Sequence, residues 1–186
     1  MQRRPKLANR LQAGSFAKEV YALMERYRDG AIIDPNNHTA IKLENHWATP
    51  KEVYRAIQRT TKITKERFAS PLNSCPEFTN YWSIHKRDQL FGASWDTYRF
   101  QWTGGSVHNP EYEDQDLNKN VATAVAAATH TEEPVFGIHI LPAWTDCNKT
   151  AYMKWLEIYP EHCKDILQIP REHFRFERPT AWRHGD

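Results

Sequence analysis

The stretch between residues 104 and 141 constrains the fold more than any other part of the chain. Residues 135–141, VFGIHIL, form the clearest buried-strand pattern, and a proline ends this run. Residues 104–108, GGSVH, run in the same way into an Asn-Pro pair. Between them, an alanine-rich segment over 114–129 places its apolar residues on one helical face. Strand, helix and strand at this spacing predict a βαβ unit, and therefore an α/β fold with a mostly parallel sheet and flanking helices.

Other patterns extend this outline toward both ends of the chain. The expected helices cover 15–29, 50–60 and 152–159, and the expected strand-like segments cover 67–73 and 173–177. The second helix has Pro50 at its first helical position, where a missing N–H costs nothing. The first strand-like segment, RFASPLN, breaks at Pro71.

Charge and length exclude several classes of protein. The 186 residues carry 25 Lys and Arg against 23 Asp and Glu, so the formal charge is only +2. A nearly balanced charge argues against nucleic-acid binding through charge alone. The longest nearly apolar run, residues 121–128, is too short to cross a bilayer, so no membrane association is expected. The cysteines Cys75, Cys147 and Cys163 form no close pair of the kind that structural zinc sites use, so we expect a reducing compartment and no metal.

The N-terminal segment differs in charge from the rest of the chain. Its first 18 residues contain five Lys and Arg and no acid. Such a segment serves as a mitochondrial targeting peptide, a nucleic-acid-binding arm or a solvated terminus. The apolar core of a secretory signal is missing, so we expect an intracellular protein, nuclear or cytoplasmic, with a mitochondrial destination left open. We divide the chain into a basic arm and helix, 1–45, and an α/β domain, 46–186.

Three proline-containing corners follow strand-like segments of the predicted sheet. They are Ser70–Asn73, Asn109–Tyr112 and Leu141–Trp144. Because ligands of parallel α/β sheets bind beyond the carboxyl ends of the strands, we expect these corners to line one crevice. Aromatic residues make up 12% of the chain, and such side chains fill cores or stack on bases.

The corner Asn109-Pro110-Glu111-Tyr112 has the groups needed to hold an exocyclic amine. The two N–H donors of such an amine are accepted by the side-chain carbonyl of Asn109 and by the backbone carbonyl of Pro110, whose ring fixes its direction. Tyr112 supplies a ring that stacks on the base. The arrangement suits methyl transfer to adenine N6, where orientation toward a methyl sulfonium and stabilisation of positive charge on nitrogen do the work. An ordinary turn that ends a strand is the alternative interpretation.

The segment RFASPLN is similar to a motif of the phosphorylated-CTD-interacting-factor family. Those enzymes are S-adenosylmethionine-dependent methyltransferases that act on the N6 of the cap-adjacent adenosine of mRNA. The order of motifs also resembles the compact phage-type DNA N6-adenine methyltransferases. The matching pieces are Trp47–Pro50, Phe68–Asn73, Asp88–Gly92, Asn109–Tyr112 and Ile140–Trp144. The resemblance covers residues 46–178 and implies a Rossmann-like methyltransferase sheet.

The resemblance also implies a role for each matching position. Cofactor contacts are expected from Trp47, Thr49, Pro50, Phe68, Ala69, Ser70, Pro71 and Asn73. Asn109, Pro110 and Tyr112 are the expected catalytic residues that hold the target adenine, and Trp144 borders the base pocket. Lys86 and Arg87 are candidates for contacts to substrate phosphates, with ordinary surface charge as the alternative. The implied cofactor is S-adenosylmethionine, and the implied partner is nucleic acid, RNA or DNA.

Two departures from the family pattern leave a second function open. The third position of the Asn-Pro motif is Pro in the family and Glu111 here, and Glu113, Asp114 and Asp116 follow it. These acids suit a helix N-terminus but repel a phosphate backbone. The chain is also shorter than its cap-methylating relatives, so other protein subunits are expected to supply part of the substrate platform. The alternative function is therefore an inactive methyltransferase-like scaffold or RNA-binding subunit.

Overall fold

The computed structural model describes residues 13–28, 48–143 and 151–176. Residues 47–178 form one compact unit, and residues 1–46 with 179–186 form another. The second of these contains the helix α1 (Ala13–Arg28), which confirms the helix predicted over 15–29. Within the described ranges, no helix combines the length and the apolarity that a bilayer crossing requires.

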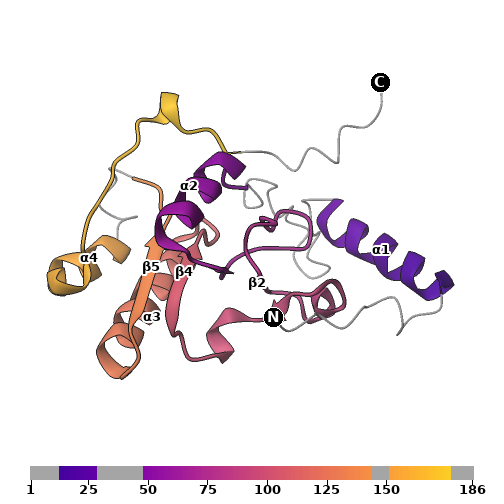
Figure 1. Ribbon diagram of the computed structural model, residues 1–186, viewed down its shortest axis with the longest axis horizontal. Helices are drawn as coiled ribbons and strands as arrows, with labels where there is room; N and C mark the ends of the chain where they lie inside the picture. The colour runs from indigo at the N-terminus through magenta and orange to yellow at the C-terminus, as the bar shows by residue number, and fades with distance from the viewer. Residues whose placement is uncertain (1–12, 29–47, 144–150, 177–186) are drawn as a thin grey trace. The chain divides into compact units, whose positions relative to one another are not determined.

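The centre of the larger unit is a sheet of five parallel strands (Figure 1). These strands are β1 (Lys65–Glu66), β2 (Asn80–Ser83), β3 (Ser94–Trp95), β4 (Gly104–His108) and β5 (Val135–His139). Their order across the sheet is β3-β2-β1-β4-β5, and every neighbouring pair runs parallel. This is the strand order of a Rossmann-like sheet, so the predicted α/β class is confirmed. The predicted βαβ unit is confirmed as well, because β4 and β5 pair from Gly104↔Val135 to His108↔His139.

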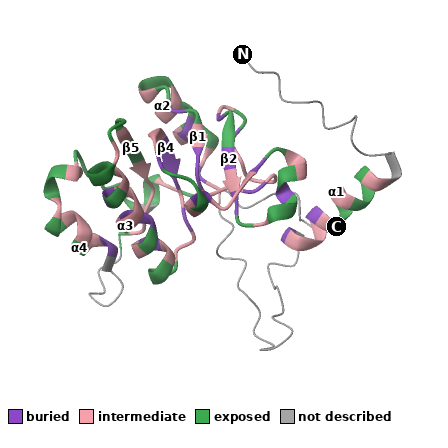
Figure 2. Cartoon of the chain, turned by 90° about the horizontal axis from the view of Figure 1, so that it is seen from below, coloured by how far each residue is buried: buried purple, intermediate pink, exposed green. Residues whose placement is uncertain are grey.

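Helices cover the two faces of this sheet. Figure 2 shows α2 (Lys51–Thr61) on one side of β4 and β5, and α3 (Asp114–His130) with α4 (Ala151–Ile158) on the other. On the α2 side, fully buried Val107 lies in a cluster with Tyr54, Ile63, Cys75 and Phe78. On the other side, α3 and α4 enclose Leu117, Val121, Val125 and Tyr152. The helices predicted over 50–60 and 152–159 are thus present, although α2 begins one residue later than expected, with Pro50 as its N-cap.

Short 3-10 helices connect the remaining elements. They are η3 (Lys86–Phe91), η4 (Thr97–Arg99), η6 (Pro160–His162) and η7 (Arg171–His173). The strand expected over 173–177 is wrong, since η7 ends at His173 and residues 174–176 join no strand. Its last residue, Glu177, lies outside the described residues. Apolar alternation in that segment reflects packing of Phe174 and Phe176 against each other, with ring centres 4.8 Å apart, rather than sheet pairing.

The RFASPLN segment also differs from its predicted strand. Strand β1 ends at Glu66, before the motif, and residues 67–73 form the turn that leaves the sheet. The strands β2 and β3 had no counterpart in the sequence patterns. They have only four and two residues, which is too few to establish a period of two.

Candidate functional site

The two corners that the sequence singled out lie next to each other in the structure. Residues 67–73 follow β1 and residues 109–112 follow β4, and these two strands are direct neighbours in the sheet. The backbone N–H of Arg67 donates to the carbonyl of Val107 at 2.9 Å, and the ring centres of Phe68 and His108 are 6.0 Å apart. The strand order reverses between β1 and β4, which is where Rossmann-like sheets bind ligands.

The first corner is a turn that holds itself rigid. The side-chain carbonyl of Asn73 accepts hydrogen bonds from the backbone N–H of Ser70 at 2.6 Å and from its hydroxyl at 2.9 Å. The Ser70 oxygen also accepts from the N–H of Leu72 at 3.2 Å. These polar atoms, expected to touch a cofactor, are therefore engaged in shaping the turn. Ala69 ties the turn to the sheet, since its N–H donates to the carbonyl of Trp82 at 2.9 Å.

The second corner brings the Asn-Pro pair against a neighbouring aromatic hydroxyl. The backbone N–H of Ile140 donates to the carbonyl of His108 at 2.8 Å, so pairing with the chain after β5 fixes the residue before Asn109. The Tyr112 hydroxyl donates to the side-chain carbonyl of Asn109 at 3.3 Å. Pro110 is buried, whereas Asn109 and Tyr112 are half-buried. The acceptor expected to hold an amine is thus already oriented by Tyr112.

Glu111 lies in an acidic environment at the start of α3. Burial raises the pKa of its carboxyl, and the nearby charges of Asp116 and Glu113 raise it further. Burial also raises the pKa of Asp116. Because the charges of these acids raise one another's pKa, the acids lie close together and form one region of negative potential beside the Asn-Pro corner.

The start of α2 lies at the same edge of the sheet. The loop from α2 to the beginning of β1 is short, so α2 runs antiparallel to the strands and its first residues lie beside their carboxyl ends. Thr49, at this end of α2, is 1% exposed, and its hydroxyl lies close enough to the Tyr54 hydroxyl to oppose the rise that burial causes in the pKa of that group. A buried hydroxyl at this edge of the sheet can also bond to a polar group of a ligand. The Thr49 hydroxyl and the half-buried ring of Phe68 suit S-adenosylmethionine, because its adenosyl and amino-acid parts carry polar groups and a flat base.

A buried carboxyl ends β1 directly below the first corner. Glu66 is 1% exposed, and its oxygen accepts the backbone N–H of Cys75 at 3.1 Å. Burial raises the pKa of Glu66 to about 7, although hydrogen bonds from Tyr54 and from the Cys75 backbone act in the opposite direction. The carboxyl therefore changes its charge near neutral pH, and no sequence pattern indicated this.

Replacing Glu66 with Gln is expected to remove one pH-dependent component of stability. The pKa of Glu66 is raised to about 7 in the folded protein from 4.5, so its favourable contribution is complete below pH 4.5 and is lost as pH rises through 7. Between pH 4.5 and 8, the free energy of unfolding of the wild type should therefore fall by up to about 3 kcal/mol relative to that of Glu66→Gln. Urea unfolding of both proteins over this range measures the difference. Exposed Glu52, changed to Gln, is the control, and an equal pH-dependence for the two variants would refute the assignment.

On the other face of the sheet, hydrogen bonds connect Arg67 to two histidines. Arg67 Nε donates to Ser106 Oγ at 2.9 Å, and Ser106 Oγ lies 2.8 Å from His108 Nε2. The Asn120 amide nitrogen lies 3.1 Å from His108 Nδ1, and Asn120 Oδ1 lies 2.7 Å from His139 Nδ1. With Asn120 in this orientation, His108 carries its proton on Nε2 and His139 on Nδ1, so each ring nitrogen in the chain of bonds has a matching partner.

Both histidines are neutral near pH 7. Burial lowers the pKa of His108, and it lowers the pKa of His139 to about 4. Their rings stack with centres 4.2 Å apart, and a Cβ on Gly137 would lie 2.6 Å from His139 Nε2. This polar core joins the carboxyl ends of β4 and β5, from which the Asn-Pro corner emerges. The one signal of this core in the sequence is the polar Asn120 on the apolar face of the predicted helix.

The other expected site residues divide into three groups. Trp47 and Trp144 lie outside the described residues. Pro50 and Pro71 are half-buried, Pro50 at the start of α2 and Pro71 within the first corner. Lys86 and Arg87 are exposed at the start of η3, which follows β2, away from the two corners along the sheet. Within the described ranges, no group of His, Cys, Asp and Glu side chains is placed to hold a metal ion.

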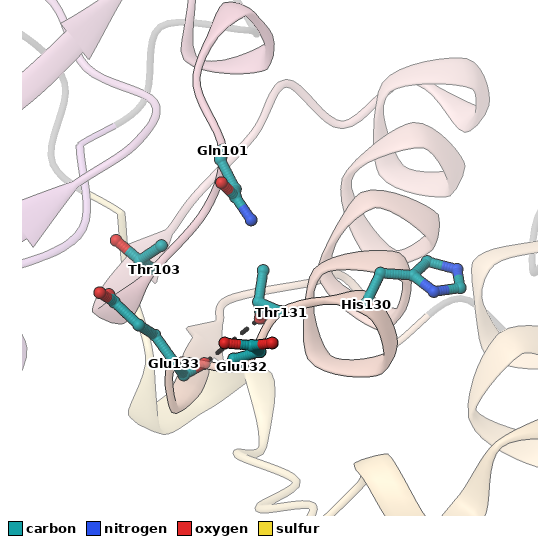
Figure 3. A pocket seen from close by; sticks show the side chains of 6 residues that line it. All are labelled: Gln101, Thr103, His130, Thr131, Glu132 and Glu133. Atoms are coloured by element: carbon teal, nitrogen blue, oxygen red, sulfur yellow. Dashed lines mark hydrogen bonds between the residues drawn. The ribbon is translucent and has the colours of Figure 1, made fainter.

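A hollow of about 560 Å³ lies elsewhere in the molecule (Figure 3). Its lining residues are Gln101, Thr103, His130, Thr131, Glu132 and Glu133. These residues precede β4 and β5 in the chain, so the hollow lies at the amino edge of the sheet. The side chains around it are polar, and none belongs to either corner. The two corners lie at the opposite, carboxyl edge of the sheet, which is therefore the candidate functional site.

One comparison with known proteins gives a match. The model of the family described as phosphorylated CTD interacting factor 1 WW domain matches residues 5–176, a span that includes every described residue. No curated protein matches the chain. WW modules bind proline-rich segments in aromatic-lined grooves. The matched residues here form a five-stranded parallel sheet with helices on both faces, and the candidate functional groups lie at the carboxyl edge of that sheet.

Proposed function

Because the chain belongs to the phosphorylated CTD interacting factor 1 WW domain family, we propose that it transfers a methyl group from S-adenosylmethionine to the N6 of adenine in nucleic acid, with RNA as the favoured substrate. The observation that carries this proposal is the adjacency of two motifs. The RFASPLN turn and the Asn-Pro corner are 39 residues apart from Ser70 to Asn109, and they lie side by side because the strands that precede them, β1 and β4, are paired. A donor and a purine bound at the two corners would be neighbours.

Each corner has a separate task in this reaction. The bound cofactor supplies an electrophilic methyl group on a sulfonium. The rigid Ser70–Asn73 turn and Phe68 would form the wall that holds the cofactor, and Thr49 would offer it a buried hydroxyl. The carbonyls of Asn109 and Pro110 accept the two N–H groups of the target amine and aim its lone pair. As the nitrogen gains positive charge, these same acceptors stabilise it more strongly, and its extra proton then leaves to solvent.

Cofactor binding is the first test of the proposal. S-adenosylmethionine and its demethylated product should each raise the melting temperature of the full chain. The expected stabilisation is about 2.7 kcal/mol at a ligand concentration 100 times the Kd, because only the folded protein binds. ATP, which shares the adenosine but lacks the amino acid, is the control ligand. If neither S-adenosylmethionine nor its demethylated product shifts the melting temperature, cofactor-dependent transfer by this chain is refuted.

A second candidate function, an inactive methyltransferase-like subunit that binds RNA, is favoured by the acids beside the Asn-Pro corner. Glu111 stands where the family has Pro, and Glu113 and Asp116 add to its negative potential. An assay with labelled methyl donor on capped RNA, uncapped RNA and DNA separates the two functions. Label in any one of these supports the enzyme and identifies its substrate. Cofactor binding without label in any of them supports the inactive subunit.

A further inference from the structure

The outer end of the sheet carries two cations stacked on one indole ring. Trp95 is the last residue of β3, the edge strand, and it is partly exposed. Arg99 Cζ lies 4.1 Å from the centre of the Trp95 ring, and Lys86 Nζ lies 5.3 Å from it. Lys86 and Arg99 are both exposed. We call Lys86, Trp95 and Arg99 the Trp95 cluster.

A strained turn places Arg99 in this cluster. Asp96 directly follows β3 and has a φ of 52°, a conformation that residues other than glycine rarely adopt. Its carboxylate accepts the backbone N–H of Tyr98 at 3.0 Å, which holds the turn and begins η4. The chain thereby folds back so that Arg99 covers a ring four residues earlier. Strain of this kind persists where other interactions enforce it, and it often accompanies a functional site.

The cations of this region have no acidic partner in contact. Among the described residues, neither Lys86 nor Arg99 has a carboxylate oxygen within the 4.0 Å of an ion pair. The same holds for exposed Lys119 of α3, whose Nζ lies 3.8 Å from the centre of the Tyr98 ring. Positive charge on aromatic faces is therefore concentrated here, although the whole chain carries only +2.

This region is continuous with the first corner of the candidate site. Tyr98 precedes Arg99 in η4, and its ring centre lies 5.8 Å from that of Phe68. Lys119 approaches the same Tyr98 ring from α3, the helix that follows the Asn-Pro corner. The aromatic contacts thus lead from the edge strand to the turn that follows β1.

We propose that the Trp95 cluster, together with Lys119 on Tyr98, binds the backbone of a single-stranded nucleic acid. Lys86, Arg99 and Lys119 contact phosphates, and the outer face of the Arg99 guanidinium stacks on a base. Flat bases stack on guanidinium groups and aromatic rings, and phosphates are neutralised by unpaired cations. An acidic peptide would match the positive charge of these cations, but its carboxylate side chains have no flat ring to stack on the outer face of the Arg99 guanidinium. The inference rests on the proposed function, in which it defines where the substrate strand lies.

Acidic residues determine which part of the bound nucleic acid faces the Asn-Pro corner. Burial raises the pKa of Tyr98, and the charges of Asp116 and Asp96 contribute to this shift. Asp116 also acts on Glu111, beside the Asn-Pro corner. The acids around Glu111 repel phosphates from the Asn-Pro corner, so the backbone stays with the Trp95 cluster and Lys119 while only the target nucleoside approaches Asn109.

The test measures binding of fluorescein-labelled single strands of about 12 nucleotides, a length within the range of one binding groove. Anisotropy titrations use the full chain without cofactor, over a series of salt concentrations, with RNA and DNA of one sequence and an RNA duplex. The variant is Lys86→Glu with Arg99→Glu. The matched control is Lys51→Glu with Arg59→Glu, two exposed residues of α2 with the same change in charge. Melting temperatures of both double variants establish that they fold.

The cluster variant should bind single strands about 10- to 100-fold more weakly, and the slope of log K against log salt should fall by about 1.4 for two lost contacts. The control should stay within about twofold. An equal loss in both variants, no loss in the cluster variant, or equal competition by poly-glutamate would overturn the proposal. Failure of the proposed function gives a different result, because cofactor binding and methyl transfer would then be absent while strand binding still depended on the cluster.

Discussion

Replacing Asn109 with Ala should abolish methyl transfer and leave cofactor binding intact. The substitution removes one of two acceptors that fix the target amine, and Pro110 alone cannot define the direction of its lone pair. Loss of orientation and of charge stabilisation together predicts a decrease in rate of about 100-fold or more. Because the first corner is built from residues 67–73 and keeps its own hydrogen bonds, the increase in the free energy of unfolding caused by S-adenosylmethionine should stay within about 1 kcal/mol of the wild-type value.

The matched control for Asn109 is Asn80, an exposed residue at the start of β2, at the opposite edge of the sheet. Asn80→Ala should retain both activities. Single-turnover assays with labelled donor, on the substrate that the wild type accepts, measure the transfer. Wild-type rates in Asn109→Ala would show that the amine is held elsewhere. Simultaneous loss of cofactor binding would show that Asn109 supports the fold of the edge rather than the amine.

Replacing Arg67 with Ala should destabilise the fold by about 3–5 kcal/mol. Arg67 is 2% exposed, and its guanidinium lies 5.0 Å from the ring centre of Trp82 and 4.7 Å from that of Trp102. Burial lowers its pKa to about 10, so it stays charged at neutral pH. Among the described residues it is paired with hydroxyls, Ser106 at 2.9 Å and Thr97 at 3.3 Å, rather than with a carboxylate. Its removal takes a donor from the Thr97 hydroxyl, leaves Ser106 with His108 as its donor, and opens a cavity beside two indoles.

Arg67→Met separates packing from charge, because it fills much of the same volume without hydrogen bonds. Arg67→Met should lower the free energy of unfolding less than Arg67→Ala does, since a buried charge can often be replaced by an apolar side chain with little loss of stability. Urea unfolding, followed by tryptophan fluorescence, measures both variants. Exposed Arg59→Ala on α2 should change stability by no more than about 0.5 kcal/mol. A loss of less than about 1 kcal/mol in Arg67→Ala would mean that the indoles close the gap by themselves.

Local patterns were sufficient where an element was long and periodic. The helices α2 and α3 and the strands β4 and β5 repeat their apolar positions over enough residues to define the element, and the proline after β5 limits it. The Asn-Pro corner could be located for the same reason, because it follows a recognisable strand. The RFASPLN motif was located as a segment, but its interpretation as a strand was wrong, since the preceding Lys65 and Glu66 make the sheet contacts.

The candidate site was only partly accessible from the sequence. Asn109 and Tyr112 were named as separate groups, yet their hydrogen bond depends on the turn that brings them together. The cofactor role of Ser70 and Asn73 stays a prediction, and the structure adds that both side chains bond to each other. Trp95, at the centre of the cation cluster, carried no sequence signal, because its two cations lie nine positions before it and four positions after it.

The sequence by itself determined the α/β class and the positions of the two corners, because both depend on neighbours within a few residues. The tertiary structure alone decided the order β3-β2-β1-β4-β5, and with it that the two corners meet. It also decided the polar core, in which Arg67 bonds to Ser106 across 39 positions of sequence and Asn120 joins two strands. A two-residue strand has no period, and a buried hydrogen bond between distant segments exists only once packing has excluded water from both partners.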